Sequence, residues 1–195
     1  MIMNVWFESI KNGFDLYLKA APLTLILAMG IIYIKKSAFN PVHFLGVQCL
    51  ILYLFCLINV VLFPLPDAAT IATLNGYTGQ FIPFRFVADI AKDRTVESVL
   101  QVVFNVMLTV PFGFFCKYIL NMKRWNVIIL TFLLSLAIEL AQLTGLFFIY
   151  PGSYRLFDVD DLMLNTLGGL AGTVLANCVS DLIPDTRNVS IALIS

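Results

Sequence analysis

The chain has 195 residues, of which 60% are hydrophobic and only 12% are charged, and its mean hydropathy is +0.92. A soluble domain of this length needs far more polar surface, so the composition predicts an integral membrane protein. Twelve basic residues balance twelve acidic ones, which leaves no basic field for nucleic acid. The four cysteines lie in apolar runs without metal-ligand spacing, as is typical of small buried residues.

Residues 1–17 place Trp6, Ile10, Phe14 and Tyr17 at helical spacing opposite polar residues. This pattern favours an amphipathic helix, which could lie in the membrane interface or pack against the other helices. A spanning helix needs roughly 20 apolar residues, and five later segments meet or approach that length. They lie at about 18–34, 42–63, 99–120, 126–149 and 162–179. The sequence therefore predicts an all-α, polytopic membrane protein, in which 18–47 form the first span and its turn.

The segment 64–98 between the second and third spans is too long to be a simple connector. Its middle, FIPFRFV from Phe81 to Val87, is aromatic and is interrupted by Pro83. We expect this segment to lie at the outer membrane interface, with Arg85 at the level of the lipid headgroups. Thr95 is placed to cap the third span.

Basic residues in the short connections predict the orientation of the chain. Lys35 and Lys36 lie between the first two spans, and Lys117, Lys123 and Arg124 flank the turn between the third and fourth. Both turns are therefore predicted to be cytoplasmic, together with the tail at 181–195. The N-terminus, the 64–98 loop and the 150–161 loop are then outside.

Several polar residues interrupt the last three spans. The third contains Asn105 and Thr109 on one helical face, followed by Pro111 and Gly113, a pattern that also suits a kinked helix joined to its neighbours by hydrogen bonds. The fourth carries Glu139 on the order of 15 Å from its outer end, and Gln142 follows one turn nearer the outside. A carboxyl group at that depth must be protonated, paired or hydrated, which favours a functional role for Glu139.

The fifth span begins directly after the densest charge in the chain, at RLFDVDDLMLNTLGGLAG. Asp161 and Asn165 lie four residues apart, and Gly168 and Gly172 continue their face as a small-xxx-small pattern for close helix packing. If this span packs on the fourth, a polar path extends from the outer surface toward Glu139. Its predicted members are Asn105, Glu139, Gln142, Arg155, Asp158, Asp160, Asp161 and Asn165.

Three chemistries could use this polar set. Arg155 could bind a phosphate or carboxylate, and Asp158, Asp160 and Asp161 could hold Mg or Ca. Glu139 and Asp161 could act as acid and base or relay protons. The alternative is structural: Arg155 pairs with an aspartate, orders the loop, and the acidic residues stabilise the start of the last helix.

The same residues resemble the VanZ-like family of bacterial membrane proteins over about residues 48–180. The resemblance is carried by FIPF at Phe81, NVMLTVPFGFF at Asn105, SLAIELAQ at Ser135 and RLFDVDDLMLNTLGGLAG at Arg155. The family's usual Phe-x-Pro-x-Gly phrase has Thr109 in place of the aromatic residue, which puts local packing in doubt. The resemblance carries over the polar set, in which the place of Asp160 is the least certain.

The resemblance implies a multi-pass protein of the bacterial plasma membrane. The family's namesake is associated with resistance to the lipid-bearing glycopeptide antibiotic teicoplanin, with little effect on vancomycin. Our leading hypothesis is a cell-envelope protein whose outward-facing polar site binds or modifies a lipid-linked or phosphate-bearing envelope component. Membrane lipids, a lipid-linked cell-wall component or the lipoglycopeptide itself would be its partners.

Two other classes of function remain open. A small proton-coupled transporter or flippase would need a homo-oligomer, whose interface could involve Gly168 and Gly172. A non-catalytic scaffold would use the polar residues only to hold helices together.

Overall fold

The computed structural model describes residues 2–35, 40–74, 76 and 78–182. Five long helices form a bundle, and among the described residues these five are long and apolar enough to cross a membrane. Three short helices and a two-stranded parallel sheet lie in the connections. This confirms the predicted all-α, polytopic architecture. The long helices are α1 (Ile2–Lys35), α2 (Pro41–Leu62), α5 (Val96–Tyr118), α6 (Arg124–Leu143) and α8 (Val159–Leu182); the short elements are α3 (Ala68–Thr73), β1 (Gly79–Gln80), α4 (Arg85–Asp93), α7 (Gly145–Phe148) and β2 (Phe157–Asp158).

The structure differs from the predicted spans at two places. The N-terminal amphipathic segment and the first span form one continuous helix, α1, which includes Pro22. Its first part packs on the bundle, since the Trp6 ring lies 4.6 Å from that of Phe104 in α5. The fourth span ends at Leu143, six residues before the predicted end, because the chain turns there into α7.

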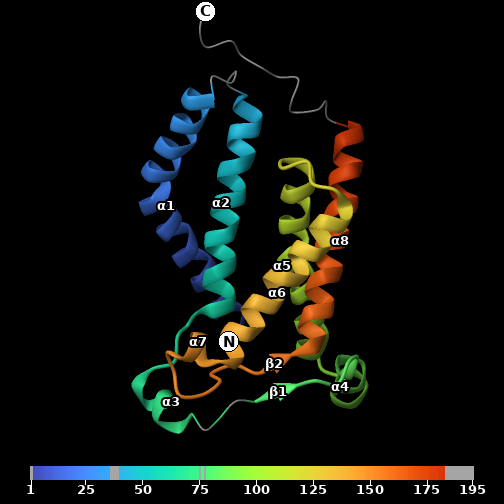
Figure 1. The fold of residues 1–195 in the computed structure, drawn as a ribbon. Coiled ribbons are helices and arrows are strands. Elements are labelled where there is room, and N and C mark those ends of the chain that lie inside the picture. The colour runs from blue at the N-terminus through green and yellow to red at the C-terminus, as the bar shows by residue number, and fades with distance from the viewer. Residues whose placement is uncertain (1, 36–39, 75, 77, 183–195) are drawn as a thin grey trace, which may run out of the picture.

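The short elements gather at one end of the bundle (Figure 1). The start of α1 lies at this end with α3, α4, α7, β1 and β2, and we call it the loop end. The α5–α6 turn lies toward the opposite end, as does the last turn of α8. The predicted grouping of the loops is therefore confirmed, while their side of the membrane stays a prediction. Lys36 and the predicted tail beyond residue 182 lie outside the described residues.

Glycines allow α5 and α8 to pack closely. A Cβ atom at Gly168 would collide with the carbonyl oxygen of Val106, and one at Gly172 with that of Val110. Gly113 on α5 in turn faces the backbone of Gly169. The predicted small-residue face is thus filled by α5 of the same chain, which leaves no room there for a second copy.

Candidate functional site

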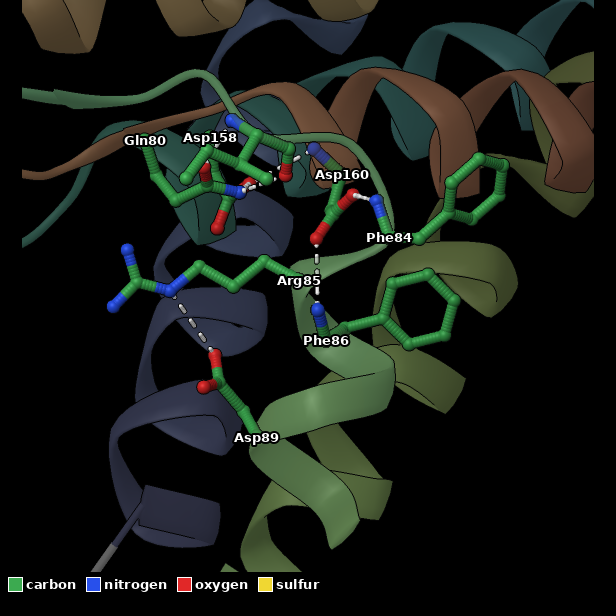
Figure 2. A network of polar contacts seen from close by, with 8 residues as sticks. Gln80, Phe84, Arg85, Phe86, Asp89, Asp158 and Asp160 are labelled. Atoms are coloured by element: carbon green, nitrogen blue, oxygen red, sulfur yellow. Dashed lines mark hydrogen bonds and ion pairs between the residues drawn. The ribbon is translucent and has the colours of Figure 1, made fainter. Parts of the chain in front are cut away.

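A short parallel ladder joins the long loop to the start of α8. Gly79 and Gln80 of β1 pair with Phe157 and Asp158 of β2, and the Phe81 ring stacks on that of Phe157 at 5.2 Å. The side chain of Gln80 donates to Asp158 Oδ1 at 3.2 Å. Figure 2 shows this bond beside the one from the backbone N–H of Asp160, which reaches the same oxygen at 2.8 Å.

Asp160 fixes α4 to α8. The backbone N–H groups of Phe84 and Phe86 donate to its two carboxylate oxygens at 2.6 and 2.9 Å (Figure 2). Phe84 is the N-cap of α4, has φ of 63° and offers no capping side chain of its own. Asp160, which is 3% exposed, therefore supplies from a distant part of the chain the carboxylate that a helix N-terminus favours.

Asp161 faces α5. The Asn105 side chain donates to Asp161 Oδ1. One turn further along both helices, Thr109 Oγ1 donates to the backbone carbonyl of Asn165 at 2.6 Å. The polar faces of the third and fifth spans therefore meet, a contact that was not predicted from the sequence, where the fourth span was the expected neighbour of the fifth.

A pocket of about 50 Å³ lies between α4, α5 and the start of α8. The α5 wall consists of Ser98, Gln101, Val102 and Asn105, which recur with helical periodicity on one face. This volume fits a group the size of an ammonium ion or a few waters, whereas a drug-sized ligand needs about 300–1,000 Å³. Four carboxylate side chains line it, Asp89, Asp158, Asp160 and Asp161, and no basic residue does.

The charges around the pocket favour a positively charged occupant. Burial raises the pKa of Asp158 above its usual range, against the hydrogen bond from the Asp160 backbone N–H, which lowers it. Arg85 lies 3.7 Å from Asp89, but both side chains are more than half exposed, so this pair contributes about 0.3–0.5 kcal/mol. Among the described residues, the weak Arg85–Asp89 pair is therefore the one ion pair that offsets the negative charge of the pocket.

Glu139 of α6 contacts the β2 strand of the ladder and does not line the pocket. It is 2% exposed, and its Oε2 accepts the backbone N–H of Asp158 at 2.9 Å. Glu139 therefore holds the strand that carries Asp158. The structure links Glu139 to the loop end through this single hydrogen bond, and a continuous polar path remains a prediction.

Gln142 and Asn165 lie in the bundle interior. Gln142 donates to the carbonyl of Val61 at 2.8 Å and so joins α6 to α2. Asn165 donates to Ser135 Oγ at 2.9 Å, while its own Oδ1 has no hydrogen-bond partner. Neither side chain lines the pocket.

Arg155 lies apart from the aspartates. Its Nη2 donates to the carbonyl of Phe63, at the end of α2, at 2.7 Å. The predicted structural pair between Arg155 and an aspartate is absent, since the described part of the chain has one ion pair, Arg85–Asp89. Burial lowers the pKa of Arg155. A partly buried guanidinium without a carboxylate is suited to an anion.

The aspartates do not form a shared ligand set. Among the described residues, no three His, Cys, Asp or Glu side chains are grouped closely enough to hold a metal ion. Both oxygens of Asp160 already accept backbone amides, and Asp161 accepts from Asn105.

Sequence reasoning missed four polar residues of this region: Gln80, Asp89, Ser98 and Gln101. Asp89 lies on a short, strongly amphipathic helix, and Gln101 lies four residues before Asn105, so helical periodicity could have indicated both. No local signal marks Gln80, whose partner lies 78 residues away.

A protein-family model described as VanZ/LLP1 matches residues 50–180, which is more than half of the 195-residue chain. The matched region includes the ladder, the pocket and all the predicted site residues. No curated protein and no solved structure matches the chain. The extent of the family match is sufficient for assignment: this membrane protein belongs to the VanZ/LLP1 family.

Proposed function

We propose that this VanZ/LLP1-family protein binds a lipid-linked or other membrane-borne component of the bacterial envelope at its loop end. The observation that carries the proposal is a pocket lined by four carboxylate side chains, which come from α4, β2 and α8. No basic side chain lines it, so its preferred occupant is a positively charged group. An amine fits better than a directly bound metal ion, because the aspartates do not converge on one point.

Arg155 would make a second, separate contact. Its guanidinium lies beside the end of α2 and has no carboxylate partner among the described residues. A phosphate or carboxylate of the same component could bind there through two parallel hydrogen bonds. The ligand class favoured by the two positions together is an amphiphile with an amine and an anionic group.

Within the pocket, Asp161 and Asn105 are the residues placed to contact the bound group. If the protein also modifies its ligand, Asp161 is the candidate acid or base, because it lines the pocket. Glu139 would act as a positioning residue through the amide of Asp158.

Selective protection against teicoplanin would follow if this binding denied the drug's lipid tail, or its target, a place at the outer leaflet. The test is to express the protein in a sensitive Gram-positive host and to compare growth inhibition by teicoplanin and vancomycin. Wild type, Asp161→Asn and Arg155→Ala would be compared at equal membrane abundance, measured by immunoblot. The matched control is Asp93→Asn, which removes an exposed α4 charge that does not line the pocket.

We expect protection by the wild type against teicoplanin alone, with loss of protection in Asp161→Asn and Arg155→Ala. Asp93→Asn should retain it. Absence of protection by an abundant wild-type protein would separate this chain from glycopeptide resistance.

A non-catalytic scaffold is the second candidate, and a specific observation favours it. Asp160, Glu139, Gln142 and Asn165 each have an intramolecular partner. For a scaffold, Asp161→Asn and Arg155→Ala would lower protein abundance and protection in parallel. For a binding site, abundance would be retained while protection is lost.

A further inference from the structure

The segment that follows α6 presents large apolar side chains in an unusual backbone conformation. Leu146, Phe147 and Phe148 have φ of 57°, 56° and 69°. Residues with a Cβ atom rarely adopt this left-handed region, and three in succession are unusual. The next residue, Ile149, is the C-cap of α7. The chain therefore turns sharply here instead of continuing the span.

This turn leaves three large apolar side chains exposed. Phe147, Phe148 and Ile149 expose 62%, 72% and 69% of their surface. Contiguous exposed apolar residues of this size indicate an interaction surface. Leu140, one turn before the end of α6, is also exposed, so the segment continues the apolar surface of a membrane span.

A second apolar segment lies at the loop end. Phe81, Ile82 and Phe84 are each at least 60% exposed, and Val87 extends this surface onto α4. Figure 1 shows α7 and α4 well separated across this end of the bundle. Like the segment after α6, the segment at 81–87 continues onto a spanning helix, because Val96 and Val99 at the start of α5 are exposed.

We infer that both segments, 147–149 and 81–87, are inserted into the membrane leaflet at the loop end. The occupant of these surfaces is lipid, because each is continuous with the lipid-facing surface of a spanning helix. Aromatic side chains are favoured at the boundary between headgroups and acyl chains. The two segments hold the loop end within the leaflet.

This position determines how the pocket is reached, a consequence that rests on the proposed function. Gln101 lines the pocket and is exposed, although it lies within the α5 span. Leu100 and Val103 beside it in the span are apolar and exposed, and Glu97 is exposed one turn nearer the loop end. The opening along α5 therefore faces the leaflet, and a membrane-borne amine enters the pocket laterally.

Tryptophan fluorescence tests the insertion. The chain has two tryptophans, so the background is Trp6→Phe with Trp125→Phe. Phe147→Trp and Ile82→Trp are then introduced singly, and the protein is reconstituted in phosphatidylcholine vesicles. Quenching by lipids brominated near the headgroup is compared with quenching by aqueous iodide. Ile149→Trp replaces Phe147→Trp if that variant does not fold.

Two reference positions calibrate the measurement. Ile26→Trp on α1 reports a lipid-facing span, and Thr73→Trp on α3 reports an exposed loop residue. We expect bromolipid quenching at positions 147 and 82 to exceed that at position 73 at least twofold, with weaker iodide quenching. Iodide quenching equal to that of Thr73→Trp at either position overturns the inference.

Lateral entry has its own test, in the same vesicles. The thermal stability of the protein is measured with octadecylamine, which is retained in the bilayer, and with water-soluble ethylamine; octadecanol controls for the alkyl chain. Asp161→Asn controls for binding elsewhere. We expect octadecylamine to stabilise the wild type at a bulk concentration at least tenfold lower than ethylamine does.

The outcomes separate the two proposals. Stabilisation by ethylamine at the same concentration as octadecylamine overturns lateral entry and leaves the amine site intact. Equal responses of wild type and Asp161→Asn to both amines overturn the proposed function, whatever the fluorescence shows.

Discussion

Asp160 at the start of α8 accepts the backbone N–H of Phe84, 76 positions earlier in the chain, at 2.6 Å. Together with the bond from Phe86, this contact gives α4 its N-terminal cap from outside its own sequence. Since α4 forms one wall of the pocket, the pocket exists only while α4 is held against α8.

Asp160→Ala should release α4. The substitution leaves two backbone amides without their charged acceptor, a loss of about 1–3 kcal/mol. Hydrogen exchange in detergent should become faster in residues 84–87 while α5 keeps its protection. Asp89→Asn changes a carboxylate on α4 itself and is the matched control, for which we expect unchanged exchange. Unaltered protection in Asp160→Ala would contradict this capping role.

Asp158 should make stability depend on pH in a predictable direction. Burial raises the folded-state pKa of Asp158. Its stabilising contribution is therefore complete below the unfolded pKa of about 3.9 and is lost as pH rises through the folded pKa. Asp158→Asn removes the ionisation but retains an acceptor for Gln80.

The variant should therefore melt at a higher temperature than the wild type at neutral pH. The difference should disappear as the pH approaches 4 (about the unfolded pKa). Thermal unfolding in detergent across this range measures it, and a difference that grows on acidification would contradict the assigned direction.

Gly168→Ala should destabilise the bundle. The added methyl group would meet the Val106 carbonyl oxygen, which cannot move without displacing α5. Such overpacking costs about 1–3 kcal/mol. Gly30→Ala is the matched control, because a Cβ atom there meets nothing within 4 Å. We expect a lower melting temperature and lower membrane abundance for the first variant only.

Gln142→Leu tests whether Gln142 only joins two helices or also contacts the ligand. The side chain joins α6 to α2 through the Val61 carbonyl and does not line the pocket. Loss of this buried bond should lower the free energy of unfolding by about 0.5–1.5 kcal/mol, while octadecylamine should stabilise the variant as it does the wild type. Loss of the amine response with normal stability would instead place Gln142 in the ligand site.

The membrane class, the five apolar spans and the shared helical face of Asp161 and Asn165 could all be predicted from the sequence. These properties depend on composition and helical periodicity, which neighbouring residues specify locally. The α1 boundary differed because an amphipathic segment can continue a span when it packs on the bundle, as Trp6 does on Phe104.

Which charged groups meet depends on the tertiary structure. Arg155 and Asp158 are three residues apart in the sequence, yet the arginine bonds to the end of α2 while the aspartate bonds to Gln80 of the long loop. Glu139, Asp160 and Gln142 likewise find partners on segments distant in the chain. A buried polar group takes whichever donor or acceptor the packing brings to it, and that packing is a property of the whole chain.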